Sequence, residues 1–131
     1  MIIMSSIVAD KPTATGNIYP RSVLNDAIEK FNKANKRNQR VGGVLNRMHI
    51  QQVKDPTHTV EEMFMNDTGV LCAKISFLES EHAQKVKDDI ESGRCIVARP
   101  VISVPAPLTE GNCVIDEIVD IVRVQIEYEK D

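Results

Sequence analysis

The residues of this 131-residue sequence that could act in catalysis are few and lie far apart. Nucleophilic catalysis needs a serine or a cysteine beside a base. Ser103 and Cys95 fall in an apolar run that is typical of a strand, and His49 falls in a stretch that is typical of a loop. A Ser103–His49 pair is therefore geometrically conceivable, although no sequence motif connects the two residues.

Metal and cofactor sites usually have recognisable spacings, which this sequence lacks. His49, His58 and His82 are scattered, and the three cysteines include no closely spaced pair of the kind that binds zinc. Gly42-Gly43 is followed by neither the lysine of a phosphate-binding loop nor the further glycines of a dinucleotide site. We therefore predict no metal and no cofactor, and we interpret the two glycines as a turn or as tight strand packing.

Charged residues gather in two kinds of cluster, both interpreted as solvated surface. The adjacent acidic pairs Glu61-Glu62 and Asp88-Asp89 place their carboxylates on different faces, because neighbours in a strand or helix diverge. A basic cluster suits the C-terminal end of a helix, and contact with nucleic acid or an acidic partner is the alternative. Its members are Lys30, Lys33, Lys36, Arg37 and Arg40.

Composition indicates one compact soluble domain. Hydrophobic residues make up 42% of the chain and charged residues 27%, and the length suits a single core. Aromatic residues reach only 4%, which argues against a surface that stacks on bases. The net charge of -3 also argues against nucleic acid as the partner. The apolar start at 1–4 is too short for a signal peptide or a membrane span, so we expect synthesis in the cytoplasm.

Residue patterning predicts an α+β domain with a mixed or antiparallel sheet and two short helices. The predicted strands are 2–9, 41–45, 59–65, 70–77, 95–104 and 122–128. The first helix follows Ser22 and has apolar residues at i, i+3, i+4 and i+7 spacing. These are Leu24, Ala27, Ile28, Phe31 and Ala34. The second helix covers 81–92, with Ser80 as its N-cap and Gly93 after its end.

Four features of the second half carry further expectations. Within 70–77, alternate residues from Leu71 to Phe77 should face the core, because side chains alternate along a strand. Pro100 indicates an edge strand or a bulge. Gln125 falls on the polar, outward side of the last strand. The acidic tail at 127–131 is either disordered or a contact, and the sequence leaves both alternatives open.

Two short motifs occur in a fixed order in the first third of the chain. Residues 19–27 read Tyr-Pro-Arg-Ser-Val-Leu-Asn-Asp-Ala, and residues 43–46 read Gly-Val-Leu-Asn. The strands 59–65 and 70–77 are also predicted to form an acidic hairpin around the turn Asn66-Asp67-Thr68-Gly69. Together with this hairpin and the glycine-ended helix, the order of the two motifs resembles the tailed-phage prohead core proteases, which are serine proteases with an assemblin-like fold. The similarity covers about residues 2–103. The resemblance therefore implies one prohead-protease-like domain over 1–131.

The resemblance also implies where catalytic residues should stand, and this chain departs from the family there. The family's catalytic histidine follows Gly-x-Leu-Asn, where this chain has Arg47, which stays protonated and cannot accept a proton. The family's nucleophile corresponds to Ala98 or Arg99, neither of which has a hydroxyl. Loss of both groups removes most triad-type catalysis. Offset substitutes would be His49 and Ser103.

An inactivated member of this family implies a non-enzymatic structural protein of a tailed-phage head. We expect a capsid decoration or cement protein, or a component of the prohead core, located in the virion. The expected partners are the major capsid protein or other head proteins, and related proteases often form homo-oligomers. Two alternatives stay open: a regulator or inhibitor that binds the active prohead protease, and a serine protease that uses His49 and Ser103.

Overall fold

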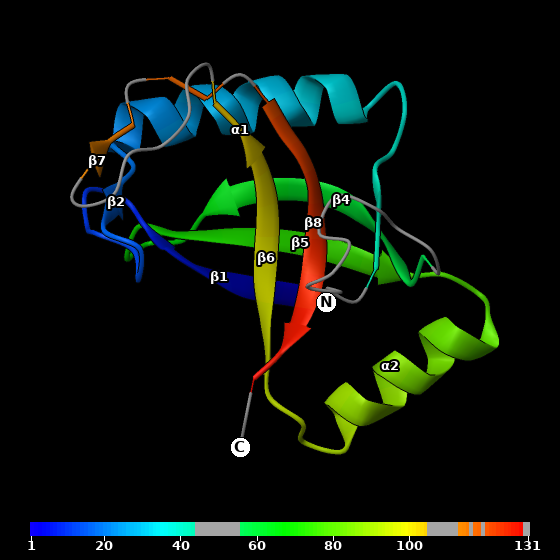
Figure 1. Cartoon of the computed structure of the whole chain (residues 1–131). Coiled ribbons are helices and arrows are strands. Elements are labelled where there is room, and N and C mark those ends of the chain that lie inside the picture. The colour runs from blue at the N-terminus through cyan, green and yellow to red at the C-terminus, as the bar shows by residue number, and fades with distance from the viewer. Residues whose placement is uncertain (44–55, 105–112, 116, 119, 130–131) are drawn as a thin grey trace.

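The computed structural model describes residues 1–43, 56–104, 113–115, 117–118 and 120–129. Figure 1 shows the arrangement of its strands and helices. In chain order they are β1 (Ile2–Val8), β2 (Asn17–Ile18), α1 (Arg21–Asn35), β3 (Val41–Gly42), β4 (His58–Met65), β5 (Val70–Phe77), α2 (Glu81–Glu91), β6 (Ile96–Ser103), β7 (Cys113–Val114) and β8 (Asp120–Tyr128). The predicted α+β domain with a mixed sheet and two helices is confirmed.

The main sheet has the strand order β3-β4-β5-β1-β6-β8. β1 is antiparallel to β5 and parallel to β6, which makes the sheet mixed. β2 and β7 form a separate parallel pair. β6 and β8 cross over the layer of β1, β4 and β5, so the sheet folds back on itself around one core (Figure 1).

The curled sheet closes where β8 meets β3 and the start of β4, a junction that we call the seam. Its backbone link runs from the Ile126 amide to the Gly43 carbonyl over 2.9 Å. Arg40 Nη1 donates to the Val122 carbonyl at 2.8 Å. His58 Nε2 bonds to the Val124 carbonyl, also at 2.8 Å. The seam therefore joins strands that are far apart in sequence, and it does so largely through side chains.

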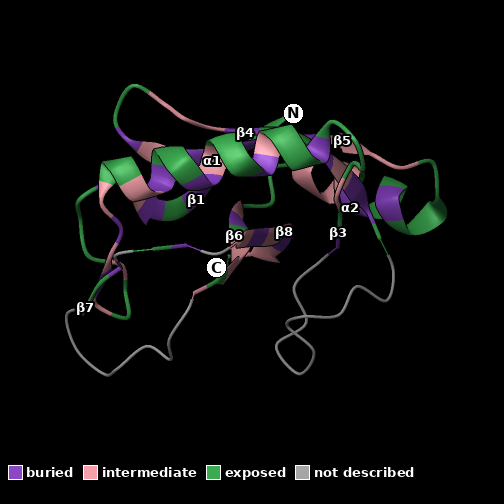
Figure 2. Ribbon diagram, turned by 90° about the horizontal axis from the view of Figure 1, so that it is seen from above, coloured by how far each residue is buried: buried purple, intermediate pink, exposed green. Residues whose placement is uncertain are grey.

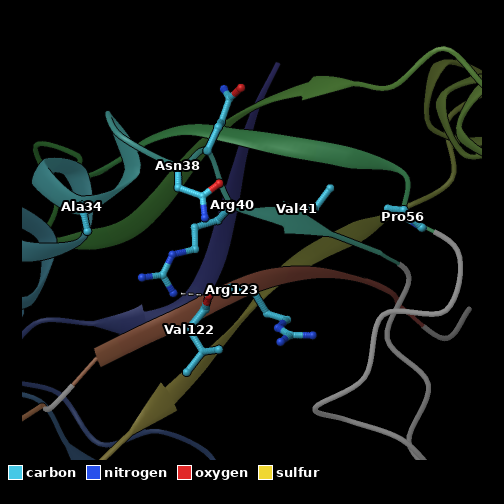
Figure 3. Close-up of a pocket in the computed structure, with 8 residues that line it drawn as sticks. Ala34, Asn38, Arg40, Val41, Pro56, Val122 and Arg123 are labelled. Carbon is cyan, nitrogen blue, oxygen red and sulfur yellow. Dashed lines mark hydrogen bonds between the residues drawn. The ribbon is translucent and has the colours of Figure 1, made fainter.

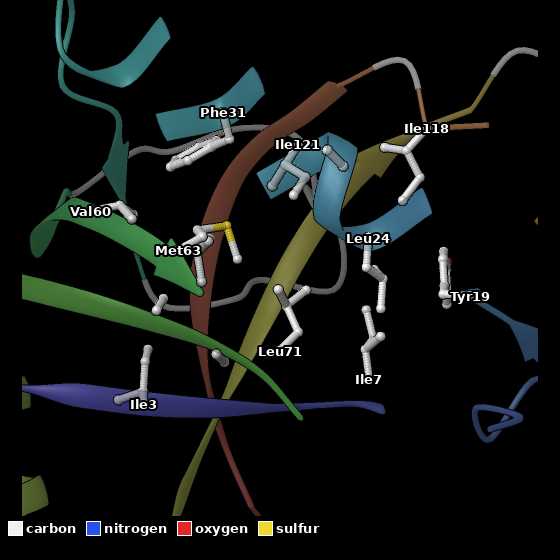
Figure 4. Packing of buried hydrophobic residues seen from close by; sticks show 14 of the residues in the cluster. Ile3, Ile7, Tyr19, Leu24, Phe31, Val60, Met63, Leu71, Ile118 and Ile121 are labelled. Atoms are coloured by element: carbon white, nitrogen blue, oxygen red, sulfur yellow. The ribbon is translucent and has the colours of Figure 1, made fainter. Parts of the chain in front are cut away.

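Helix α1 covers the core with one face. Leu24, Ala27 and Phe31 are buried at helical spacing, and Figure 4 shows Leu24 pointing toward Ile7 and Phe31 lying over Met63. Seen from above, the outer side of α1 is mostly exposed (Figure 2). The predicted buried helix face is thus confirmed over its first three turns.

The end of α1 differs from the prediction, because Ala34 is exposed and Asn35 is buried. The Asn35 amide donates to the carbonyls of Val60 and Glu61 at 2.8 and 3.2 Å. One turn earlier, Asn32 donates to the Met63 carbonyl and accepts from the Met63 amide, both at 2.8 Å. A polar residue takes the inward position because α1 lies along the outer side of β4, where backbone groups need partners.

The hairpin of β4 and β5 is confirmed, with Asn66 in its turn accepting from the amides of Thr68 and Val70 at 3.0 Å. Gly69 has φ +82, a conformation that suits glycine. As predicted, the inward set of β5 is buried at Leu71, Ala73 and Ile75 and partly buried at Phe77. The hairpin thus forms one wall of the core.

Helix α2 also follows its sequence signals. The Ser80 hydroxyl accepts from the Ala83 amide at 3.1 Å, and Gly93 has φ +103. Arg94 stacks 3.9 Å from the centre of the Tyr128 ring, which attaches the end of α2 to the end of β8. In the described part of the chain, neither helix is long and apolar enough to cross a membrane.

Strands β6 and β8 decide three expectations. Pro100 predicted an edge strand or a bulge; β6 lies between β1 and β8 and so is not an edge strand, whereas its register with β8 shifts after Val101, which agrees with the bulge. The pairing of β6 with β1 occurs at Ser5 and Ala98, before Pro100. Gln125 was expected to face outward and is fully buried, since its side chain accepts a hydrogen bond in the seam. The acidic tail starts later than position 127, because β8 pairs with β6 as far as Tyr128.

Candidate functional site

A buried polar cluster occupies the seam. Thr57, His58 and Gln125 are all fully buried. His58 Nδ1 lies 2.7 Å from the Thr57 hydroxyl, and Nε2 lies 2.8 Å from the Val124 carbonyl. A carbonyl only accepts, so Nε2 carries the proton and Nδ1 accepts from Thr57. Burial lowers the pKa of His58, which favours this neutral form.

Gly42 and Gly43 fit closely into this cluster. The Gly43 amide donates to Gln125 Oε1 at 2.7 Å. A Cβ on Gly42 would stand 2.1 Å from the Val124 carbonyl oxygen and 2.4 Å from His58 Nε2. The tight strand packing expected at the glycine pair is therefore confirmed. The Thr57 amide also donates to the Gly42 carbonyl at 2.9 Å, so the seam holds the residues on both sides of 44–55 close together.

An open hollow lies beside the seam, between the end of α1, β3 and β8, and has a volume of about 600 Å³. We call it the arginine hollow. Its lining residues are Ala34, Asn38, Gln39, Arg40, Val41, Pro56, Val122 and Arg123. Figure 3 shows Arg40 extending from the segment before β3 and Arg123 from β8, with their guanidinium groups pointing away from each other and Arg40 bonded to the Val122 carbonyl. Two guanidinium groups thus line this hollow.

Ala98 and Arg99, the two positions that the sequence resemblance implied for the family's nucleophile, lie in the middle of β6 and point in opposite directions. Ala98 is 2% exposed and packs in the core. Arg99 faces outward, and its Nε and Nη2 bond to Glu127 Oε2 at 2.7 and 2.5 Å. This alternation follows from strand geometry. A side chain at position 98 is hidden from solvent, and the one at position 99 is held by a carboxylate.

Ser103 lies at the end of β6 and is exposed. It lines a small hollow of about 200 Å³ together with Val101, Ile102, Val122 and Arg123. Of the predicted site residues, Arg47 and His49 lie outside the described residues. The structure therefore brings Ser103 near Arg123.

Neither described histidine is placed to activate Ser103. Both ring nitrogens of His58 are engaged inside the seam, and the ring is fully buried. His82 is on α2, which lies beyond the opposite end of β6 from Ser103 (Figure 1). Burial raises the pKa of the Cys72 thiol, which makes it a poor nucleophile. Over the ranges that the structure describes, no group of three or more metal-ligating side chains converges.

Comparison with known proteins places this fold among those of capsid assembly proteases. No protein-family model matches the chain, and neither does any curated protein sequence. The structure of the bacteriophage T4 capsid assembly protease, gp21, matches with a TM-score of 0.64 and 15% sequence identity, over 95% of this chain and 79% of that chain. At this identity the match establishes the fold. The prohead-protease-like fold predicted from the sequence is confirmed.

Sequence reasoning missed the seam and its polar cluster. Thr57 and His58 carry no motif, and Gln125 follows the polar half of an alternating pattern. One signal was available, because Gly42-Gly43 predicted close packing without saying against what. The partner strand is more than 80 residues away in sequence, as the Gly43–Gln125 bond shows. No local pattern could have identified it.

Proposed function

We propose that this chain is a non-enzymatic protein of a tailed-phage head that keeps the prohead-protease fold and lacks the protease's chemistry. The supporting observation is the state of the two nucleophile positions on β6. The Ala98 methyl is buried in the core, and the Arg99 guanidinium is bonded to Glu127. A nucleophile must be exposed to substrate and carry a hydroxyl or thiol. Neither position meets both conditions.

The sequence supports the same conclusion at the position of the base. Arg47 follows Gly-Val-Leu-Asn, where the family's histidine would stand. A guanidinium remains protonated in proteins, so it cannot take a proton from a serine. With neither group at the position that the resemblance implies, the family's own catalytic pair is absent from those positions.

The proposed role is binding to the head without cleavage. The protein with the similar structure is a capsid assembly protease, and a protease that acts during capsid assembly must recognise head proteins. A copy without catalysis could keep that recognition and serve as a decoration, cement or core protein in the virion. The expected partner is the major capsid protein or another head protein. This step is an analogy from fold to function.

Co-sedimentation with empty capsids of the phage that encodes the chain tests the role. Unexpanded and expanded capsids are each centrifuged with increasing protein, and the protein alone serves as the control. We expect saturable binding with a fixed number of copies per capsomer to at least one of the two capsid states. Absence of binding to both would contradict the proposal, and inhibition of the active protease would then be the next function to measure.

One observation favours an active protease as the second candidate. Ser103 is exposed and lines a hollow that also contains Arg123. If Ser103 is an activated nucleophile, a fluorophosphonate probe labels the folded wild-type protein and does not label Ser103→Ala. Ser6→Ala is the matched control, because Ser6 is an exposed serine of β1. We expect no labelling of any of the three proteins, and specific labelling of Ser103 would overturn the non-enzymatic proposal.

A further inference from the structure

The arginine hollow is positively charged in a chain whose net charge is -3. Its lining contains two arginines and two amides, Asn38 and Gln39, and among the described lining residues there is no carboxylate. Lys36 and Arg37 precede the hollow at the end of α1. Clefts lined by one sign of charge concentrate ligands of the opposite sign. The hollow therefore favours an anionic ligand.

Arg123 gives the clearest indication that the hollow suits an anion. It is half-buried on β8, and its guanidinium has no hydrogen-bond or ion-pair partner among the described residues. The basic residues at the end of α1 could be explained by the helix dipole, which favours cations there. Arg123 is on a different element, so the dipole does not explain it. A partly desolvated cation without a counter-charge is a natural anchor for a carboxylate.

Arg40 is held in a fixed orientation beside it. Its Nη1 contacts both the Val122 carbonyl at 2.8 Å and Asp120 Oδ2 at 3.4 Å. The guanidinium also lies 5.7 Å from the centre of the Phe31 ring. These contacts use one nitrogen of a group that has five N–H donors, so Arg40 retains donors for a ligand. Because its position is already fixed, little rotamer entropy is lost on binding.

The rest of the lining indicates what kind of anion fits. Ala34, Val41, Pro56 and Val122 add apolar surface, and Val41 is 41% exposed. No aromatic side chain lines the hollow in the described part of the chain, which disfavours stacking on bases. A mixture of apolar contacts, amides and two guanidinium groups suits a peptide better than a nucleic acid. A volume of about 600 Å³ is in the range of ligand pockets.

We propose that the arginine hollow docks an acidic peptide segment of a protein partner. Carboxylates of the segment pair with Arg123 and with the remaining donors of Arg40, the amides of Asn38 and Gln39 contact its backbone, and its aliphatic carbons cover Val41 and Pro56. The segment is bound and released intact. This inference rests on the proposed function in one respect, since it identifies the surface through which a head protein would be bound.

Fluorescence anisotropy with a short labelled peptide of alternating glutamate and alanine tests the proposal directly. The same peptide with glutamine in place of glutamate controls for charge, and a single-stranded oligonucleotide of equal charge tests a general preference for anions. We expect the wild type to bind the glutamate peptide more tightly than either control. Arg123→Glu should weaken that binding at least tenfold, because it places like charges together.

Lys85→Glu is the matched variant, because it makes the same charge change at an exposed position on α2. It should leave peptide binding within about twofold of the wild type, as expected for a screened distant charge. Thermal unfolding confirms that both variants fold. Equal losses in the two variants, no binding of the glutamate peptide by the wild type, or tighter binding of the oligonucleotide at the same hollow would each overturn the proposal.

Capsid co-sedimentation of Arg123→Glu separates this inference from the proposed function. If the wild type binds capsids and the variant does not, both are supported. If the two bind capsids equally well, the hollow is not the docking surface, although the head-binding function stands. If the wild type binds the peptide but no capsid, the docking surface stands and the head-binding function falls.

Discussion

The hairpin of β4 and β5 and the seam between β8 and β3 both hold two strands together, by different means. The hairpin has a ladder of backbone pairs from His58–Phe77 to Met65–Leu71. The seam combines one backbone bond, Ile126 to Gly43, with side chains of Arg40, His58 and Gln125. Backbone pairing tolerates many side chains, whereas the seam requires particular ones. Substitutions should therefore affect the seam far more than the hairpin.

Replacing Gly42 with alanine should have the largest effect. The new Cβ would stand 2.1 Å from the Val124 carbonyl oxygen and 2.4 Å from His58 Nε2, so strand or ring must move. We expect the free energy of unfolding to fall by about 3 kcal/mol, as for severe overpacking of a core. Urea denaturation followed by circular dichroism measures the loss.

Gly93→Ala is the control for that variant. Gly93 has φ +103, and no atom lies within 4 Å of the position that a Cβ would take, so alanine there introduces backbone strain without a clash. Its expected cost is about 1–2 kcal/mol. Equal losses for the two glycines would mean that the seam is no more tightly packed than an exposed helix end.

Gln125→Leu should have the next largest effect. It keeps the apolar volume but removes the acceptor of the buried Gly43 amide. Leaving such a donor unpaired costs about 2 kcal/mol. The hairpin control is Glu62→Gln on β4, away from the seam. Glu62 is exposed and its side chain has no partner among the described residues, so this change should stay within about 0.5 kcal/mol. A smaller loss for Gln125→Leu than for Glu62→Gln would reverse the comparison.

Acid should weaken the seam through His58. Burial lowers the pKa of His58 below its ordinary value of 6.5, so the unfolded state binds more protons than the folded state at mildly acidic pH. Its stabilising contribution is complete above pH 6.5 and declines as the pH falls through the folded-state pKa. Urea midpoints at neutral and mildly acidic pH should therefore differ in the wild type.

The matched histidine variants identify the source of this pH dependence. His58→Gln should reduce the difference between the two midpoints, whereas His82→Gln should leave it unchanged, because His82 is exposed on α2. If both variants keep the wild-type pH dependence, other groups cause it and His58 is not the acid-sensitive residue of the seam.

Breaking the Arg99–Glu127 pair should have the smallest effect. The Arg99 side chain is 47% exposed and the Glu127 side chain 13%, so one end of the pair is open to solvent, and β6 and β8 are already joined there by backbone pairs. Exposed ion pairs contribute less than about 1 kcal/mol. A double-mutant cycle of Arg99→Gln and Glu127→Gln measures the coupling between them. A coupling well above that limit would mean that this ladder, unlike the hairpin, depends on particular side chains.

The sequence predicted the local parts of the fold well. The Asn66–Gly69 turn, the Ser80 cap and Gly93 are signals that act within a few residues, and each appears in the structure as expected. The prediction of which α1 residues face the core was wrong at the end of the helix, where Asn35 is buried and Ala34 is exposed. Asn35 faces inward because its side chain hydrogen-bonds to the backbone of β4. The spacing of hydrophobic residues carries no information about such bonds.

The candidate site was less predictable, for the same reason. The sequence left open whether Ala98 or Arg99 takes the nucleophile position. In the structure Ala98 is buried and Arg99 faces outward. Arg123 had no motif at all, and its proximity to Arg40 depends on the closure of the sheet. Residues that are far apart in sequence and meet only in the folded protein produce no periodic pattern in the sequence. A site built from such residues can therefore be found only from the tertiary structure.

The way α1 lies against β4 has a consequence for the protein at high local concentration. The amides of Asn32 and Asn35 occupy backbone groups of Val60, Glu61 and Met63, and the seam occupies carbonyls on the outer side of β8. Unpaired strand edges are templates on which other chains aggregate. Because these backbone groups are already hydrogen-bonded, a neighbouring copy cannot use them to add a strand to the sheet. Many molecules could therefore be held close together, as on a particle surface, without growing into fibres.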